Sequence, residues 1–261
     1  QPCPPAQVFS LSPFGRLCRG AVSPWRCMTV SDSLPAAVIF DMDGVLVDSN
    51  PFHLQKWIDL LNQHGIAYDP DDLPKQILGH RNDTAFRYFF GPSLRDEEIQ
   101  QLSEELEERF RKTFRPHALP LPGVASLIAE FHDAGLTMAV ASSAMGKNVE
   151  LIVEALGFRP YFRCLVTGDE VTHPKPHPEI SLKTADKLGV SPSRCLAFED
   201  SFVGVEAAKR AGMVCVAIGS TFPLEELRAQ THADLIVGSF EDLNLPCLQE
   251  LFRKPARSFT A

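Results

Sequence analysis

Two carboxylates one residue apart, Asp41 and Asp43, follow the apolar run 36–40 and precede Gly44. The run is short and partly β-branched, which is typical of a strand buried on both faces of a parallel sheet. Acids at the end of such a strand lie where open α/β sheets bind their ligands. Because two neighbouring carboxylates repel each other, they need a cation or a proton between them. The alternative is an ordinary polar turn, since Asp and Gly are common turn residues.

Two further apolar runs end in polar residues that could join the same site. Ser142 and Ser143 follow one of them, and Glu199 and Asp200 follow the other. Because the carboxyl ends of parallel strands meet at one edge of the sheet, we expect these side chains to lie near one another. Carboxylates from two strands suit a small hard cation that prefers oxygen ligands, which predicts Mg2+ as the cofactor.

Lys175 supplies a positive charge to this predicted site. It lies between Pro174 and Pro176, just ahead of a predicted helix, so its backbone is fixed. An ammonium group, a serine hydroxyl and the amides of a helix N-terminus are suitable partners for phosphate oxygens. One carboxylate could attack phosphorus to form a phosphoaspartate, and a second could protonate the leaving oxygen. The expected chemistry is phosphoryl transfer.

His173 and His177 lie in the same proline-rich loop. The prolines between them prevent a helix that would present both rings on one face. We therefore expect no zinc site built from histidine and cysteine ligands.

The elements that must position these residues alternate between strands and helices, with one exception. Residues 51–118 show only helical periodicity and end in a proline-rich boundary. The expected later strands are 137–141, 164–166, 195–198, 214–218 and 235–237. This order predicts an α/β fold with a Rossmann-like parallel sheet core and a small all-helical cap inserted after the first strand. Residues 31–50 and 119–261 would form the catalytic core, and 51–118 a cap that can act as a lid.

The cap sequence contains two clear helix signals. The first covers 52–64, with Ser49 or Asn50 as its expected N-terminal capping residue. The second covers 95–114 and is acidic at its start and basic at its end, which suits the helix dipole. We expect its charged residues, Glu107 among them, to form a solvated face.

Composition limits the classes of function. The chain has 261 residues and a formal net charge of -8, which argues against a general nucleic-acid binder or membrane-surface binder. No apolar run approaches the length of a membrane span. The seven cysteines include no CxxC pair, and Cys195 and Cys215 lie in strand-like runs, so we expect them to be reduced core residues. These features predict a monomer of the cytoplasm.

Residues 1–30 differ from the rest in composition, since they contain arginine and serine but no acid. They resemble an organellar transit peptide, which would place the protein in an organelle. The alternative is an extension upstream of a start at Met28. In either case we expect them to be disordered.

Together these features resemble the haloacid dehalogenase superfamily over residues 36–252. The residues that match its motifs are Asp41 to Val45, Ser142, Lys175, and Glu199 with Asp200. The resemblance implies that Asp41 is the nucleophile and Asp43 the general acid and base. It implies Mg2+ bound by the Asp41 carboxylate, the Asp43 backbone carbonyl and Asp200, with Glu199 supporting it. The residues that would hold the phosphoryl group are Ser142, Ser143 and Lys175.

Within that superfamily, residues 48–57 are similar to the β-phosphoglucomutase-like group of phosphatases and mutases. The candidate substrate residues of the cap are His53, His80 and Arg81. Leu78 stands where a mutase would need a lysine for the distal phosphate, although Arg81 could substitute.

The predicted function is a magnesium-dependent phosphatase of a small phosphorylated metabolite, with a sugar phosphate as the expected substrate class. One alternative is a β-phosphoglucomutase-like phosphosugar mutase. An alternative of another class is a catalytically silent binding protein on the same fold. The sequence names neither the substrate nor the oligomeric state.

Overall fold

A parallel sheet forms the centre of the protein in the computed structural model, which describes residues 34–253. The predicted extension 1–30 lies outside the described residues. The strands are β1 (Ala37–Phe40), β2 (Thr137–Ala141), β3 (Phe162–Val166), β4 (Cys195–Glu199), β5 (Val214–Ile218) and β6 (Leu235–Val237). The sheet has six strands in the order β3-β2-β1-β4-β5-β6, and neighbouring strands run parallel to each other. The predicted Rossmann-like core is confirmed.

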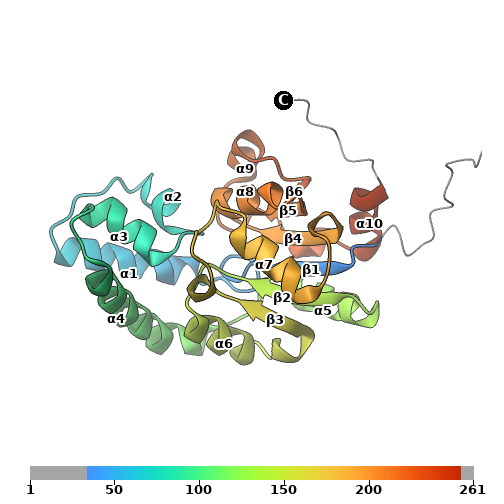
Figure 1. Ribbon diagram of the computed structural model, residues 1–261, viewed down its shortest axis with the longest axis horizontal. Coiled ribbons are helices and arrows are strands. Elements are labelled where there is room, and N and C mark those ends of the chain that lie inside the picture. Colours follow the sequence, from blue (N-terminus) through green and yellow to red (C-terminus); the bar gives the residue numbers. More distant parts are fainter. Residues whose placement is uncertain (1–33, 254–261) are drawn as a thin grey trace, which may run out of the picture.

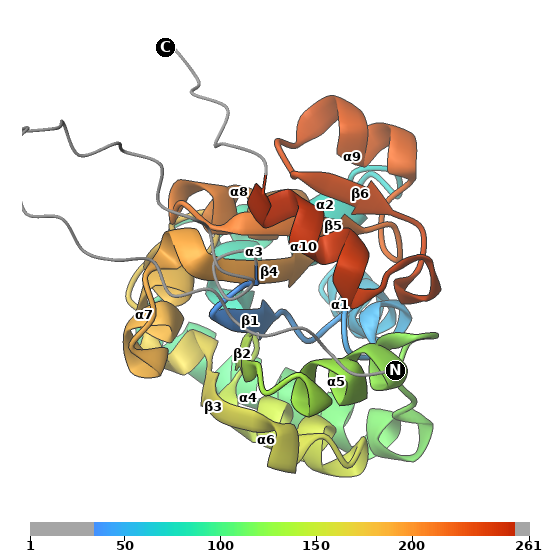
Figure 2. The same ribbon diagram turned by 90° about the vertical axis from the view of Figure 1, so that its right-hand side faces the viewer.

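Helices cover both faces of this sheet (Figure 2). Those on one face are α5 (Val124–Asp133), α6 (Gly146–Ala155) and α10 (Leu245–Arg253). Those packed on the other face are α7 (Glu179–Leu188), α8 (Phe202–Arg210) and α9 (Leu224–Gln230). Successive side chains of β1 explain the two layers, because Val38 and Phe40 pack with the first set while Ala37 and Ile39 pack with the second.

The helical insert lies at one end of the long axis of the molecule (Figure 1). It consists of α1 (Asn50–Gln63), α2 (Leu73–Ile77), α3 (Asn82–Phe90) and α4 (Asp96–Phe114). We call residues 50–117 the cap. Trp57, Leu61 and Phe86 are buried in it, so the cap has apolar packing of its own. The predicted domain limits at residues 51 and 118 stay a prediction.

Several short elements were not predicted. The 3-10 helices are Arg115–His117, Arg159–Tyr161, Gly168–Glu170, Pro192–Arg194 and Phe240–Asp242. Helices α9 and α10 were also missed, because each is under three turns long. Leu227 of α9 and Leu248 of α10 are buried, so tertiary packing holds these helices in place.

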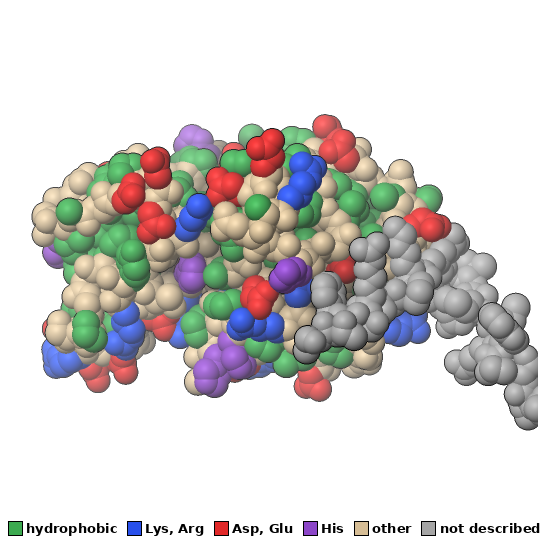
Figure 3. Space-filling model, turned by 90° about the horizontal axis from the view of Figure 1, so that it is seen from above, with side chains coloured by type: hydrophobic (Ala, Val, Ile, Leu, Met, Phe, Trp, Pro, Cys, Tyr) green, Lys and Arg blue, Asp and Glu red, His purple; other side chains and the backbone are tan. Residues whose placement is uncertain are grey.

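Among the described residues, the face drawn in Figure 3 has no large patch of a single charge. Acidic and basic side chains are interspersed over the face drawn in Figure 3. No helix among residues 34–253 has the length and apolar character that a membrane crossing requires.

The cysteines of the core should react slowly with alkylating agents. Cys195 and Cys215 are buried free thiols, as predicted, whereas Cys247 is exposed. Burial raises the pKa of Cys195 to about 11, so only about one molecule in a thousand carries its thiolate at pH 8. We expect iodoacetamide at pH 8 to label Cys247 in the folded protein and Cys195 only after denaturant is added, as read by peptide mass spectrometry. Labelling of Cys195 at the rate of Cys247 in the folded protein would contradict this.

Candidate active site

The central strand β1 positions the first two acids. The Asp41 amide donates a hydrogen bond of 2.9 Å to the Phe198 carbonyl, so the sheet continues to the candidate nucleophile, which is 4% exposed. The chain then turns at Gly44, which has a φ of +71°. A Cβ at Gly44 would lie 1.9 Å from Asp200 Oδ2, so glycine is required for the loop after β1 to pass against that acid.

Three buried carboxylates meet at this edge of the sheet. Asp41, Glu199 and Asp200 each offer an oxygen within 4.8 Å of the others. Lys175 Nζ lies 2.8 Å from Glu199 Oε1 and 3.3 Å from Asp41 Oδ1. Strands β1 and β4 are neighbours, which is why acids predicted from two separate runs come together.

The electrostatics of this cluster follow from its burial. Burial is the largest cause that raises the pKa values of Asp41 and Glu199, although Lys175 acts against it. Burial, followed by the neighbouring Asp41, raises the pKa of Asp200 to about 7. Burial alone would lower the pKa of Lys175, but the two carboxylates beside it raise that pKa above its usual value. The lysine therefore stays charged, and one ammonium faces three acids.

Two carboxylate oxygens of this cluster show that it can accept a cation. Within the described part of the chain, Asp41 Oδ1 and Glu199 Oε2 are buried and accept no hydrogen bond. An unpaired buried carboxylate oxygen is costly, and a bound metal ion would remove that cost. Oxygen ligands and an excess of negative charge fit Mg2+.

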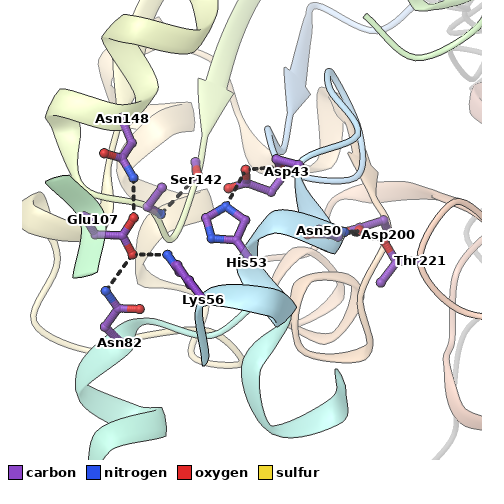
Figure 4. Close-up of polar contacts among 12 residues, drawn as sticks. Asp43, Asn50, His53, Lys56, Asn82, Glu107, Ser142, Asn148, Asp200 and Thr221 are labelled. Atoms are coloured by element: carbon purple, nitrogen blue, oxygen red, sulfur yellow. Dashed lines mark hydrogen bonds and ion pairs between the residues drawn. The ribbon is translucent and has the colours of Figure 1, made fainter. Parts of the chain in front are cut away.

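The first residue of the cap is hydrogen-bonded to one of these acids, Asp200. Asn50, the first residue of α1, donates from Nδ2 to Asp200 Oδ2 at 3.0 Å and to Thr221 Oγ1 at 2.6 Å. The Thr221 hydroxyl also donates to Asp200 (Figure 4). The sequence indicates Asn50 only as a helix cap, and no sequence signal points to Thr221.

Asp43 is held by two residues of the cap entrance. The Ser49 hydroxyl donates to Asp43, and His53 Nε2 lies 3.1 Å from Asp43 Oδ1 (Figure 4). Ser49, one of the two predicted capping residues, is the N-cap of α1, but its side chain makes no capping hydrogen bond because its hydroxyl donates to Asp43. Burial would raise the pKa of Asp43, but the charge and hydrogen bond of His53, with the bond from Ser49, lower it overall. The His53 ring is stacked on the Phe110 ring, with 4.1 Å between the ring centroids.

The two serines after β2 have different surroundings. Ser142 is 1% exposed and its Oγ accepts a 3.1 Å bond from the Ala144 amide, which leaves the hydroxyl proton available. Ser143 donates instead to the carbonyl of Gly79 in the cap at 2.9 Å. Ser142 therefore keeps a hydroxyl proton to donate, whereas Ser143 joins core to cap.

A cavity of about 520 Å3 lies between cap and core. Asp41, Asp43 and Ser142 line it from the core, and His53 and His80 line it from the cap. Burial lowers the pKa of His80, so this ring is neutral near pH 7. Asp41, Asp43 and Ser142 thus face one space between cap and core.

Arg81 also lines this cavity, but its guanidinium is occupied. It forms an ion pair with Asp83 and donates to the carbonyls of Gly168 at 3.3 Å and Val171 at 2.8 Å. The group therefore joins cap to core in this structure. Arg87, another cavity residue, is paired with Asp96.

The charged face predicted for the long cap helix is partly wrong. Glu107 is 4% exposed and pairs with Lys56 Nζ at 2.5 Å. It also accepts from Asn82 at 2.7 Å and from Asn148 of the core at 2.6 Å (Figure 4). The prediction failed because helix α4 packs between α1 and α6, so this one acid faces neither solvent nor a regular apolar stripe.

His173 and His177 lie together, contrary to the expectation that the prolines keep their rings apart from a common site. Their ring centroids lie 4.6 Å apart, and Glu179 joins them in a group whose ligand atoms lie within 4.8 Å of one another. The prolines do prevent a shared helix face, but the loop itself brings the rings together.

The chain is similar to known proteins in both sequence and structure. The model of the haloacid dehalogenase-like hydrolase family matches residues 38–218. YhcW of Bacillus subtilis (strain 168), which carries a provisional phosphatase name, is 37% identical over 190 residues, which cover 70% of this chain and 82% of that protein. The fructose-1-phosphate phosphatase YqaB of Escherichia coli (strain K12) is 31% identical over 183 residues, covering 70% of this chain and 96% of that protein.

A solved structure is similar over nearly its whole length. The crystal structure of a β-phosphoglucomutase from Clostridium difficile has a TM-score of 0.73 and 27% sequence identity. The match covers 84% of this chain and 98% of the mutase. The fold of core and cap is therefore shared with enzymes that act on phosphorylated compounds.

Proposed function

Because this chain belongs to the haloacid dehalogenase-like hydrolase family, we propose that it is a magnesium-dependent phosphatase of a small phosphorylated metabolite. The proposed substrate is a sugar phosphate, and the proposed intermediate is a phosphoaspartate on Asp41. Relatives named fructose-1-phosphate phosphatase and β-phosphoglucomutase support this substrate class. The observation that carries the proposal is the buried cluster of Asp41, Glu199 and Asp200 with Lys175, in which Asp41 lines the cavity below the cap.

The residues of the cluster fit a magnesium ion. Asp41, Asp200 and the backbone carbonyl of Asp43 would hold it, with Glu199 beside them. When bound, the ion would offset negative charge on the transferring phosphoryl group. Lys175 would contribute to the same task, since its ammonium is buried among the acids.

The side chains of the chain would perform two chemical steps. In the first, the Asp41 carboxylate attacks phosphorus and the bond to the leaving oxygen breaks as Asp43 supplies a proton. In the second, Asp43 takes a proton from water, which attacks the phosphoaspartate and releases phosphate. His53 lies against Asp43, so the pair can hold the proton that is given up in the first step and regained from water in the second. The cap would exclude other water from the cavity.

The occupied arginines favour a phosphatase over a mutase. A mutase must also bind a second, distal phosphate, and Arg81 and Arg87 are each paired with an acid. A phosphatase needs only that water reach Asp41. The similarity to β-phosphoglucomutases keeps the mutase as the second candidate.

In this proposal the core and the cap have different roles. Residues 31–50 and 119–261 would supply catalysis, and 51–118 would supply substrate selection through cap closure. His53, His80 and Arg81 are the proposed substrate-facing residues of the cap. A monomeric state and a cytoplasmic location stay predictions.

An assay with phosphorylated metabolites tests the function. With Mg2+ present, we expect release of inorganic phosphate from at least one sugar phosphate. We expect EDTA to reduce that release to background and excess Mg2+ to restore it, because the acids need a cation to bind a phosphate dianion. A mutase would instead isomerise a phosphosugar and require a sugar bisphosphate for activation. If neither phosphate release nor isomerisation occurs with any substrate, the proposal fails.

A further inference from the structure

A cluster of two histidines and a glutamate lies outside the catalytic cavity. His173 and His177 are exposed, and Glu179 is the first residue of α7. One nitrogen from each ring and one carboxylate oxygen lie within 4.8 Å of one another. None of the three lines the cavity between cap and core. The phosphatase chemistry proposed above therefore leaves this cluster unused.

Backbone hydrogen bonds hold the side chains of this cluster in place. Glu179 accepts from the amides of Thr172 at 2.9 Å and His173 at 2.8 Å. Its Oε2 also lies 2.8 Å from His173 Nδ1. On the second histidine, the Glu179 amide donates to His177 Nδ1 at 3.3 Å. The three groups are thus positioned before any ligand arrives.

The loop between the histidines is stiff, which lowers the entropy lost when an ion binds. Proline occupies positions 174, 176 and 178, so three backbone φ angles are fixed in this loop. Preorganised ligands bind more tightly, because less conformational freedom is lost on binding.

The type of ligand follows from the donor atoms. Two imidazoles with one carboxylate suit a transition-metal ion such as Zn2+, whereas Mg2+ prefers a set of oxygen ligands. Hydrogen bonds from the Thr172 and His173 amides lower the pKa of Glu179 to about 2, so this carboxylate is charged at neutral pH.

The charged groups near the cluster do not exclude a cation. Arg210 reaches the Pro176 carbonyl at 3.5 Å but is paired with Glu206 at 2.6 Å. Arg81 interacts electrostatically with Glu179 but is paired with Asp83. Each nearby arginine is therefore offset by its own acid.

We propose that His173, His177 and Glu179 form a binding site for a transition-metal ion of the Zn2+ type, separate from the acidic cluster. Three protein ligands leave a position for water, as in open zinc sites. The ion would link His173, which precedes Lys175, to His177 and Glu179, which follow it. It would thereby stabilise the folded state by mass action.

Equilibrium dialysis with Zn2+ tests the site in the full chain. Excess Mg2+ is present so that the acidic cluster is occupied by its proposed ion. We expect His173→Ala and His177→Ala each to bind one Zn2+ fewer than wild type, and Glu179→Gln to bind at least tenfold more weakly. The matched control is His64→Ala, an exposed histidine of the cap, which should bind as many ions as wild type.

Thermal melting gives a second reading that does not depend on counting ions. We expect Zn2+ to raise the melting temperature of wild type and of His64→Ala, and to raise it less in the two loop variants. Circular dichroism of each variant without Zn2+ checks that it folds. Equal stoichiometry in wild type and both loop variants would overturn the proposal. A loss in His64→Ala as large as in the loop variants would also overturn it, since binding would then be scattered over surface histidines.

Discussion

Asp41→Asn should reduce phosphate release by a factor on the order of 10⁴ or more, because the amide cannot attack phosphorus. Asp41 lies at the end of the central strand, 4% exposed, with the Lys175 ammonium 3.3 Å from its Oδ1. Among residues 34–253, it is the carboxylate that both pairs with Lys175 and lines the cavity. The measurement is the rate of phosphate release with Mg2+ on the substrate found in the metabolite assay.

The matched control for this variant is Asp48→Asn. Asp48 lies in the same segment, but its side chain is exposed. We expect this variant to keep wild-type activity, and both variants to keep the wild-type circular dichroism spectrum. Full activity in Asp41→Asn would refute the nucleophile assignment while leaving the family intact.

Lys56→Met should destabilise the folded protein by about 3 kcal/mol or more, since it leaves a buried carboxylate without its counter-ion. Lys56 and Glu107 are 6% and 5% exposed and pair at 2.5 Å. The Lys56 ammonium also lies 4.8 Å from the centre of the Phe110 ring, which stacks on His53. Urea denaturation followed by circular dichroism measures the change in the free energy of unfolding.

A double-mutant cycle separates the pair from its surroundings. Glu107→Gln should also destabilise the protein, because it leaves the buried ammonium unpaired, whereas the double variant should lose much less than the sum of the two. Lys112→Met is the control, because its pair with Glu108 is solvent-exposed on the same helix and should contribute under about 1 kcal/mol. If Lys56→Met and Lys112→Met have equal effects, the Lys56 pair does not act as a buried one.

The pair also matters for how the cap meets the core. Glu107 accepts from Asn148 of α6, so the network that Lys56 neutralises spans both parts of the chain. A loss of this charge balance should weaken this contact between cap and core.

The sequence by itself determined the architecture and the acids at its centre. Apolar runs ending in Asp41, Ser142 and Asp200 were visible because strands are short, buried on both faces and end abruptly. Ligand sites in such sheets lie at the carboxyl ends of the strands, so the position of these residues followed from topology alone. The helical insert was equally visible from its periodicity and its bounding prolines.

Only the tertiary structure decided the partners of these residues. Asn50 meets Thr221 across 171 positions, and Lys56 meets Glu107 across 51. Such pairs leave no period in the sequence, because they depend on how the cap docks and on which turn of each helix faces the other. The meeting of His173 with His177 depends in the same way on the path of a loop, for which helical and strand periodicities give no rule. Local patterns therefore fixed where the chemistry lies, and the packing of distant segments decided which side chains control it.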